Sequence, residues 1–418
     1  MQGRSVMPER HFPVVPNLRR LRTEAKKLHR AIRREDPAAV ADLRTHHPDA
    51  IAPEATKLAD AQLVLARSYG LPSWPRLVLA CGMTHALCHD DVGAVRELIL
   101  QHPHLLHEDA RGVKGNWGPP MSYAANLGRD RIIAMLRDLG AADLDFAFDR
   151  ACLQGQLKTA RLLFDMGARP TADSLMGPAE TQNAAGMEFL LSLGAPMSDR
   201  SGDRLAPVAM VLEGYARNPE GKHQCLELLA MHGIELPDTP AMAVHRGRID
   251  RLEEHLARDA GLLSRTFSHE EIYPPSLGCH EDHSLALHGT PLAGSTLLHL
   301  CVDYDEMPIA RWLLERGADP DARAEVDGEG FGGHTALFGT VVCQARRKDD
   351  RFARLLLDAG ADPNARASLR KRLRFVADET MHEYRDVTPL SWGRRFHDQD
   401  WVSRAAMKLI ESRGGHGS

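Results

Sequence analysis

The sequence predicts an all-α fold, built as a solenoid of stacked helix pairs. The chain has 418 residues, which is more than a single hydrophobic core usually serves. Hydrophobic residues make up 43% of it but aromatic residues only 5%, a composition that suits helices better than a β-sandwich. A Gly-Ala pair also recurs after leucine-rich stretches. Together these observations indicate a repeated unit of helix, glycine stop and loop.

Charge and cysteine usage exclude several classes of function. The formal net charge is −5, so the total gives no reason to expect nucleic acid or an anionic membrane as a partner. Seven cysteines are scattered without a CxxC pair, which favours reduced thiols in a cytoplasmic protein. We expect residues 1–16 to form a flexible tail, because charges and prolines stand where a signal peptide would be apolar, and no run is long enough to span a bilayer.

The glycine stop marks the repeat. Each copy follows an amphipathic stretch and places glycine where a helix ends in a left-handed residue. The copies are Leu139-Gly140-Ala141, Met166-Gly167-Ala168, Leu193-Gly194-Ala195, Arg316-Gly317-Ala318-Asp319-Pro320 and Ala359-Gly360-Ala361-Asp362-Pro363.

The C-terminal copies are the sharpest. One starts Thr296-Leu-Leu-His299 and ends Gly317-Ala-Asp-Pro-Asp-Ala-Arg323; two further starts are Thr335-Ala-Leu-Phe338 and Thr388-Pro-Leu-Ser391. This pattern resembles the ankyrin repeat, with its TPLH start, two helices and GADxNA end. The resemblance implies an ankyrin-repeat solenoid that binds proteins through a concave face of first helices and through projecting loops, the fingers. It also implies that His299 forms a structural hydrogen bond between repeats.

The chain ahead of these copies divides into two regions. Residues 17–82 predict three helices, and Leu18, Leu21, Ala25, Leu28 and Ile32 give the first one an apolar face. This region resembles the helical leader ahead of some bacterial ankyrin-repeat proteins, and we expect it to cap the solenoid. Residues 84–263 predict degenerate repeats that keep the helix pair but mostly lack the TPLH start.

Three long segments accompany the near-consensus repeats of residues 295–418: one precedes these repeats and two lie between them. They are residues 264–294, 324–334 and 367–387, each directly before a repeat start. Because fingers share one edge of an ankyrin stack, we expect the three to lie together. Long loops in a compact fold are usually functional or disordered, and these are not of low complexity. We therefore predict ordered, functional fingers.

The fingers hold the candidate chemistry. His334 ends the second finger, the third contributes His382, Glu383 and Arg385, and His397 follows in the last repeat. A histidine beside a carboxylate can act as a general base, and arginine can hold an anion. We expect these five to be the catalytic residues if the fingers form an active site. The alternative is that they are ordinary polar surface groups.

Other residues are candidates for binding a ligand or partner. The run 366–374 has five basic residues in nine, and Arg370, Lys371 and Arg372 are its centre, suited to an acidic protein or an anionic small molecule. The remaining candidates lie on the expected concave face and in the last repeat, namely Asp303, Tyr304, Tyr384, Trp392 and Arg395. A solvated basic loop is the alternative for the run.

No metal or cofactor is expected. Cys279, His280 and His283 are ligand types in close sequence, but their spacing matches neither a zinc finger nor HExxH. Phosphate-binding and nucleophile-elbow motifs are absent from the sequence. Two functions remain open: an interaction module for a protein partner, and an enzyme or small-ligand site that uses hydrolysis or elimination chemistry on an anionic substrate.

Overall fold

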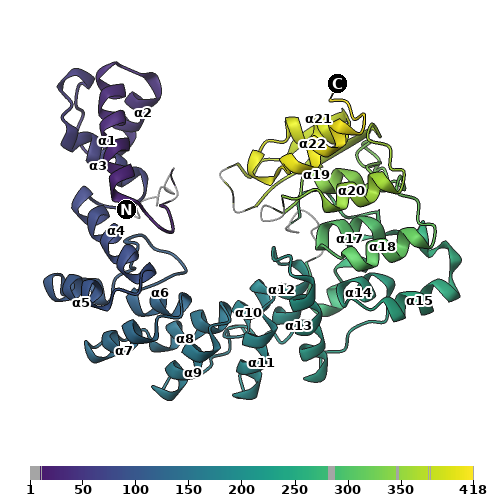
Figure 1. Ribbon diagram of the computed structural model, residues 1–418, viewed down its shortest axis with the longest axis horizontal. Helices are drawn as coiled ribbons and strands as arrows, with labels where there is room; N and C mark the ends of the chain where they lie inside the picture. The colour runs from purple at the N-terminus through teal and green to yellow at the C-terminus, as the bar shows by residue number, and fades with distance from the viewer. Residues whose placement is uncertain are drawn as a thin grey trace. The chain divides into compact units, whose positions relative to one another are not determined.

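The structure, a computed structural model, describes residues 10, 12–280, 288–344, 348–374, 376 and 378–417. The chain divides into two compact units, Met1–Pro170 and Thr171–Ser418, which are described separately below. Both are helical stacks, as Figure 1 shows, and the described strands are short. The all-α solenoid predicted from the glycine pattern is confirmed.

The described elements of the first unit are all helices. They are α1 (Leu18–Arg33), α2 (Pro37–His46), α3 (Leu58–Ser68), α4 (Trp74–Cys88), α5 (Val92–Gln101), α6 (Pro120–Asn126), α7 (Asp130–Asp138), α8 (Leu144–Leu153) and α9 (Leu157–Asp165), with 3-10 turns at Pro53–Ala55 and Pro103–Leu106.

The leader forms as its apolar periodicity predicts. Asn17 caps α1 by accepting a hydrogen bond from the Arg20 backbone N–H. Leu21, Ala25, Leu28 and Ile32 are buried on one face of α1, which packs against α3 in a core of its own. The opposite face exposes arginine and lysine side chains to solvent.

The boundary predicted at residues 82–84 falls inside a helix. Ser73 caps α4, and the helix continues to Cys88. It packs against α3 of the leader and against α5 and α6 of the first repeats. The leader and the repeats therefore share α4, so no linker separates them there.

The second unit holds the remaining elements. Its helices are α10 (Met176–Thr181), α11 (Ala184–Ser192), α12 (Ala206–Glu213), α13 (Pro219–Met231), α14 (Pro240–His245), α15 (Ile249–Arg258), α16 (His269–Ile272), α17 (Leu297–Tyr304), α18 (Met307–Glu315), α19 (Ala336–Val341), α20 (Arg351–Asp358), α21 (Pro389–Arg395) and α22 (Arg404–Ser412). Its 3-10 turns are Ala260–Leu263, Pro275–Leu277 and Gln399–Trp401, and its strands are β1 (Thr266–Phe267), β2 (Ser295–Thr296), β3 (Ala367–Lys371) and β4 (His382–Val387).

Helix pairs repeat through this unit. The first helices α14, α17 and α19 stack in one row and the second helices α15, α18 and α20 in another (Figure 1). Gly317 and Gly360 end α18 and α20 with φ angles of 92° and 98°, where a side chain would be strained. The earlier glycine stops 140, 167 and 194 also have positive φ. The glycine signature was thus a true helix stop.

His299 forms the structural hydrogen bond that the ankyrin resemblance implied. Its Nε2–H donates to the His334 carbonyl oxygen at 3.1 Å, and its Nδ1 lies 2.9 Å from the Thr296 hydroxyl. His334 stands directly before the next repeat start, so the imidazole ties one repeat to the next. Burial lowers the pKa of His299 to about 3, which keeps the ring neutral.

The three fingers are ordered where described, and they meet one another through backbone hydrogen bonds. Glu325 N–H of the second finger donates to Gly294 O of the first at 2.8 Å. Gly332 N–H, also of the second, donates to Ser368 O of the third at 2.6 Å. The third finger is an antiparallel hairpin of β3 and β4. The expected clustering of the fingers is therefore present.

The first finger also crosses the ends of the first helices. Near its start, Ile272 O accepts a hydrogen bond from His245 of α14 at 2.9 Å, and the Tyr273 hydroxyl bonds that of Tyr304 in α17. Near its end, the Thr290 hydroxyl donates to Val342 O after α19 at 2.9 Å. The chain's own insertion thus covers part of the side that ankyrin-like stacks were expected to offer to partners.

Candidate functional site

A pocket of about 410 Å³ lies where the three fingers meet. The first finger contributes His269 and Leu292, the second contributes Val326 and Phe331, and the third contributes residues 369–372 and Met381. The pocket is therefore assembled from segments distant in sequence, and it exists only because the fingers are ordered.

Apolar side chains form the rim and one wall. Val326 and Met381, which both line the pocket, are 62% and 50% exposed. Phe331 is only 5% exposed, and the guanidinium groups of Arg370 and Arg385 lie 5.0 and 4.1 Å from its ring centre. Cations near the face of an aromatic ring are attracted to it. Phe331 thus forms a wall that the two arginines hold in place, whereas Val326 and Met381 form an exposed apolar rim.

The exposed cations of the third finger have partners. Arg370 pairs with Asp327 at 2.8 Å and with Glu329, both in the second finger. Arg372 Nε–H donates to the Glu379 carbonyl oxygen at 2.9 Å. Arg370 therefore joins two fingers, whereas Arg372 bonds within the third finger itself.

Lys371 differs from its neighbours. It lines the pocket and is only 6% exposed. Within the described part of the chain, its amine forms neither a hydrogen bond nor an ion pair. Burial lowers the pKa of Lys371 to about 8; Asp303 opposes this shift and Arg217 adds to it. A buried cation without an anion is costly, so this amine is a candidate binding group.

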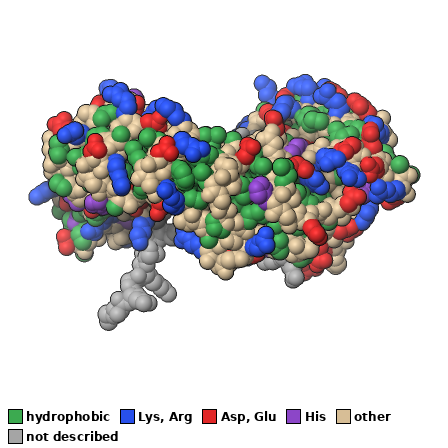
Figure 2. Space-filling model, turned by 90° about the horizontal axis from the view of Figure 1, so that it is seen from below, with side chains coloured by type: hydrophobic (Ala, Val, Ile, Leu, Met, Phe, Trp, Pro, Cys, Tyr) green, Lys and Arg blue, Asp and Glu red, His purple; other side chains and the backbone are tan. Residues whose placement is uncertain are grey.

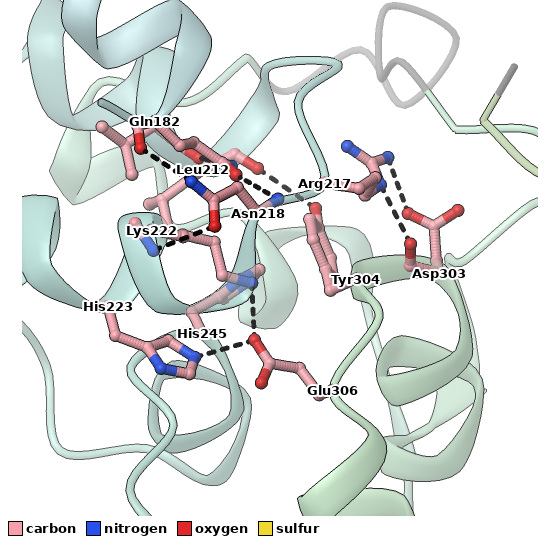
Figure 3. A network of polar contacts seen from close by, with 12 residues as sticks. Gln182, Leu212, Arg217, Asn218, Lys222, His223, His245, Asp303, Tyr304 and Glu306 are labelled. Carbon is pink, nitrogen blue, oxygen red and sulfur yellow. Dashed lines mark hydrogen bonds and ion pairs between the residues drawn. The ribbon is translucent and has the colours of Figure 1, made fainter. Parts of the chain in front are cut away.

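Next to Lys371 lies a buried ionic network, drawn in Figure 3. Arg217 Nη2 is 2.7 Å from Asp303 Oδ2, and its Nε–H donates to the Asp303 carbonyl oxygen at 2.9 Å. The Oε1 atom of Glu306 lies 3.3 Å from Lys222 Nζ and 2.8 Å from His223 Nε2. The Arg217–Asp303 bonds connect the segment before α13 to α17. The bonds of Glu306 connect α13 to the turn after α17.

The network corrects the prediction for Asp303 and Tyr304. Their exposed fractions are 6% and 2%, so neither offers surface to a partner. The Tyr304 hydroxyl donates to Leu212 O at 3.1 Å, and its ring receives Lys222 Nζ at 4.0 Å from the ring centre. Both residues bind other parts of the chain instead of a ligand.

His334 reaches the pocket but is committed to the fold. Its exposed fraction is 1%, and its Nε2–H donates to Pro291 O in the first finger at 2.9 Å. Burial lowers its pKa to about 4. With its proton engaged and its ring sealed, His334 holds two fingers together, which corrects its assignment as a general base.

The other predicted catalytic residues lie around β4. His382 and His397 stack with ring centres 4.0 Å apart, and His382 Nε2 lies 2.9 Å from Asp378. Glu383 and Arg385 form an exposed pair at 3.4 Å. Among the described residues, none of these four bonds to His334, so the five do not form one catalytic cluster.

The last three predicted binding residues belong to the packing of the final repeat. The Tyr384 hydroxyl donates to His397 Nδ1 at 2.7 Å and accepts from the His397 backbone N–H at 3.0 Å. Trp392 is fully buried, with its ring edge-on to Tyr384. Arg395 donates to Arg385 O at 3.4 Å. Tyr384 and Trp392 are interior, so the structure does not support direct contact with a partner.

The candidate metal ligands Cys279, His280 and His283 do not form a common site among the described residues. Cys279 is buried, and burial raises its pKa, which favours the thiol. His280 Nδ1 pairs with Glu213 of α12 at 2.8 Å. His283 lies outside the described residues. Among the residues that the structure describes, no group of three histidine, cysteine or acidic side chains is placed to hold a metal ion.

Sequence reasoning missed Val326, Phe331 and Met381. Val326, Phe331 and Met381 are each flanked by polar or glycine residues, so neither periodicity nor a motif marks them. Only the meeting of the fingers brings the three to one pocket. For Lys371 a signal existed: Ala367, Leu369 and Lys371 alternate with Ser368 and Arg370, and the period of two turns the lysine inward with the leucine.

The match to a family model supports the repeat assignment for one segment of the chain. The ankyrin repeat family model matches residues 293–325, which include the copy with His299. No curated protein matches the chain. Among solved structures, the crystal structure of the human ASB11 ankyrin repeat domain is similar at 18% identity, with 72% of this chain and 99% of that chain covered and a TM-score of 0.25.

Two further findings concern membrane spans and surface charge. Among described residues, every helix is too short or too polar to cross a bilayer. On the face shown in Figure 2, acidic and basic side chains are interspersed.

The family match, the glycine stops and the His299 hydrogen bond all indicate the same kind of repeat. Residues 293–325 are therefore an ankyrin repeat.

Proposed function

We propose that this chain is a protein-interaction module that holds a segment of its partner in the pocket between the three C-terminal fingers. Ankyrin repeats generally mediate protein–protein interactions, and the proposal adds where this chain does so. The observation that carries it is the pair of exposed apolar side chains, Val326 and Met381, at the rim of a pocket built by ordered fingers.

The first finger supports the choice of this surface. It crosses the ends of α14, α17 and α19 on the side of the first helices and forms hydrogen bonds there. A partner would have to displace these contacts to reach the helices. The finger pocket needs no such displacement, and its hydrogen-bonded walls lose little entropy on binding.

A small anionic ligand is the second candidate. A volume of about 410 Å³ lies in the range of small-molecule pockets, and Lys371 lines it. The enzyme hypothesis has less support, because His334 is sealed and, among the described residues, none of the other four predicted catalytic residues bonds to it. Binding, rather than hydrolysis or elimination, is thus the function that the geometry favours.

Selection of random dodecapeptides displayed on phage, with the full chain as target, tests the proposal. We expect selected peptides to lose at least about tenfold in affinity for Val326→Asp and for Met381→Asp, because each change puts a charge on the apolar rim. Fluorescence anisotropy of synthetic peptides measures this.

Met231→Asp is the matched control. Met231 is 79% exposed and ends α13, outside the pocket, so its replacement leaves peptide binding unchanged. Circular dichroism confirms that each variant is folded. Peptides that bind both rim variants as tightly as the parent chain would refute the assignment of the surface.

A reducing compartment such as the cytoplasm is part of this proposal. It is supported by the seven cysteines, which form no disulfide in the described part of the chain and are buried except Cys88, which is half-buried. Labelling of the chain unfolded in denaturant with a thiol reagent, before and after reduction, tests whether these buried thiols are already reduced when the protein is isolated.

A further inference from the structure

We propose that the Lys371 amine is an anion anchor, which binds a carboxylate that enters the finger pocket. The inference rests on the proposed function for the pocket and names its ligand chemistry. The carboxylate can come from an aspartate or glutamate side chain of a bound protein, or from a free small organic acid. Both sources present the same group to the amine, and the experiment below separates them.

The hairpin of the third finger fixes the position of the lysine. In the β3–β4 pairing Lys371 stands opposite His382 and Leu369 stands opposite Tyr384. Leu369, two residues earlier on the same face of β3, is 1% exposed. The side chain of Lys371 is therefore turned inward with a core residue, while Arg370 lies on the other face and binds the second finger.

The nearby carboxylates already have partners inside the chain. Asp303 is held by Arg217 through two bonds, at 2.7 and 2.9 Å. Asp327 is held by Arg370 at 2.8 Å. Glu325, which also lines the pocket, accepts the Thr266 hydroxyl. Within the described residues this leaves the buried ammonium of Lys371 without a carboxylate of its own, a gap that an incoming anion would fill.

The titratable and charged groups that face Lys371 come from several elements. They are Asp303 and Arg217 of the buried network, His397 after α21, His382 opposite on β4, and the pocket-lining His269, His288, His334, Glu325, Asp327, Arg370 and Arg372. Burial has already lowered the pKa of Lys371 to about 8, and a bound carboxylate raises it again by stabilising the charged form. Binding therefore weakens as pH rises above about 8.

Competitive labelling of the unmodified full chain gives the first test. Trace acetylation with acetic anhydride at pH 7.5, read by peptide mass spectrometry, reports the reactivity of each lysine. We expect glutarate or acetate, at millimolar concentration and constant ionic strength, to slow acetylation of Lys371 by at least about threefold. Lys408, exposed on α22, serves as the internal control and keeps its rate. Equal rates for Lys371 with and without acid would overturn the proposal.

Peptide selection gives the second test and separates the sources. If a protein supplies the carboxylate, dodecapeptides selected on the full chain carry aspartate or glutamate. Those peptides bind Lys371→Met at least about tenfold more weakly, and Lys408→Met as tightly as the parent.

The two proposals fail differently. Protection by glutarate without any selected peptide assigns the pocket to a free acid: the anion anchor then stands and the protein-binding function falls. Peptides that require Val326 and Met381 but bind Lys371→Met normally, with no protection by acids, leave the protein-binding function standing and refute the anchor.

Discussion

Two histidines connect successive repeats through single hydrogen bonds. His299 Nε2–H donates to His334 O, and His334 Nε2–H donates to Pro291 O. Both rings are buried and neutral, with pKa values lowered to about 3 and about 4 from an ordinary 6.5. Burial favours the neutral imidazole at both places, because a charged ring there would lose its hydration.

The stability of the second unit should fall as pH is lowered. The unfolded histidine takes up a proton near pH 6.5, whereas folded His334 resists it until about pH 4. The folded state thus loses stability progressively across this window, by about 3 kcal/mol for His334 if its full shift applies. Urea unfolding followed by tryptophan fluorescence at pH 7 and pH 4.5 measures the loss.

His334→Gln keeps a donor for Pro291 but cannot take up the proton. We expect it to reduce the pH dependence of the unfolding free energy between pH 6.5 and 4.5. His232→Gln, at an exposed position after α13, leaves that dependence unchanged. The same pH dependence in His334→Gln as in the parent chain would mean that the ring titrates normally in the fold.

At the scale of elements, the first finger departs most from a plain repeat. It was predicted to be ordered, but its path along the ends of the first helices was not. Gly289 makes this path possible, because a Cβ there would lie 2.6 Å from Val342 O and 2.9 Å from the Cys343 Cα. Backbone atoms cannot move aside as a flexible side chain can.

Gly289→Ala is therefore expected to destabilise the second unit by about 1–3 kcal/mol, or to lift the finger from α19. Gly328→Ala in the second finger is the matched control, because a Cβ there has open space and the backbone has no positive φ. Urea unfolding measures the cost, and hydrogen exchange at residues 288–292 reports the lifting. Equal stability and equal exchange for the two variants would show that the finger does not pack as described.

At the scale of the whole molecule, the chain consists of two compact units, and the pocket lies within the second, Thr171–Ser418. Stability in repeat arrays comes mainly from each repeat and its neighbours. The leader, with its own core, belongs to the first unit. Its role as a cap of the solenoid remains a prediction.

The fragment 171–418 should consequently fold without the first unit and bind selected peptides within about twofold of the full chain's affinity. Its circular dichroism spectrum and peptide affinity test this. A fragment that is unfolded, or that has lost binding, would show that the first unit is needed for the second to form.

The sequence by itself determined the repeat. Glycine stops, the TPLH-like start at Thr296 and the apolar face of α1 are local signals, and each acts through its own backbone or helix periodicity. The long fingers were equally visible as extra length. These features could be predicted because the physical cause lies within a few residues of the effect.

The tertiary structure alone decided which finger residues meet. It sealed His334, paired Arg370 with the second finger, buried Asp303 and Tyr304, and gathered Val326, Met381 and Lys371 at one pocket. Whether a polar residue is a ligand-binding group or a structural one depends on burial and on partners far away in the chain. That information lies in the packing of the fingers, and no local pattern carries it.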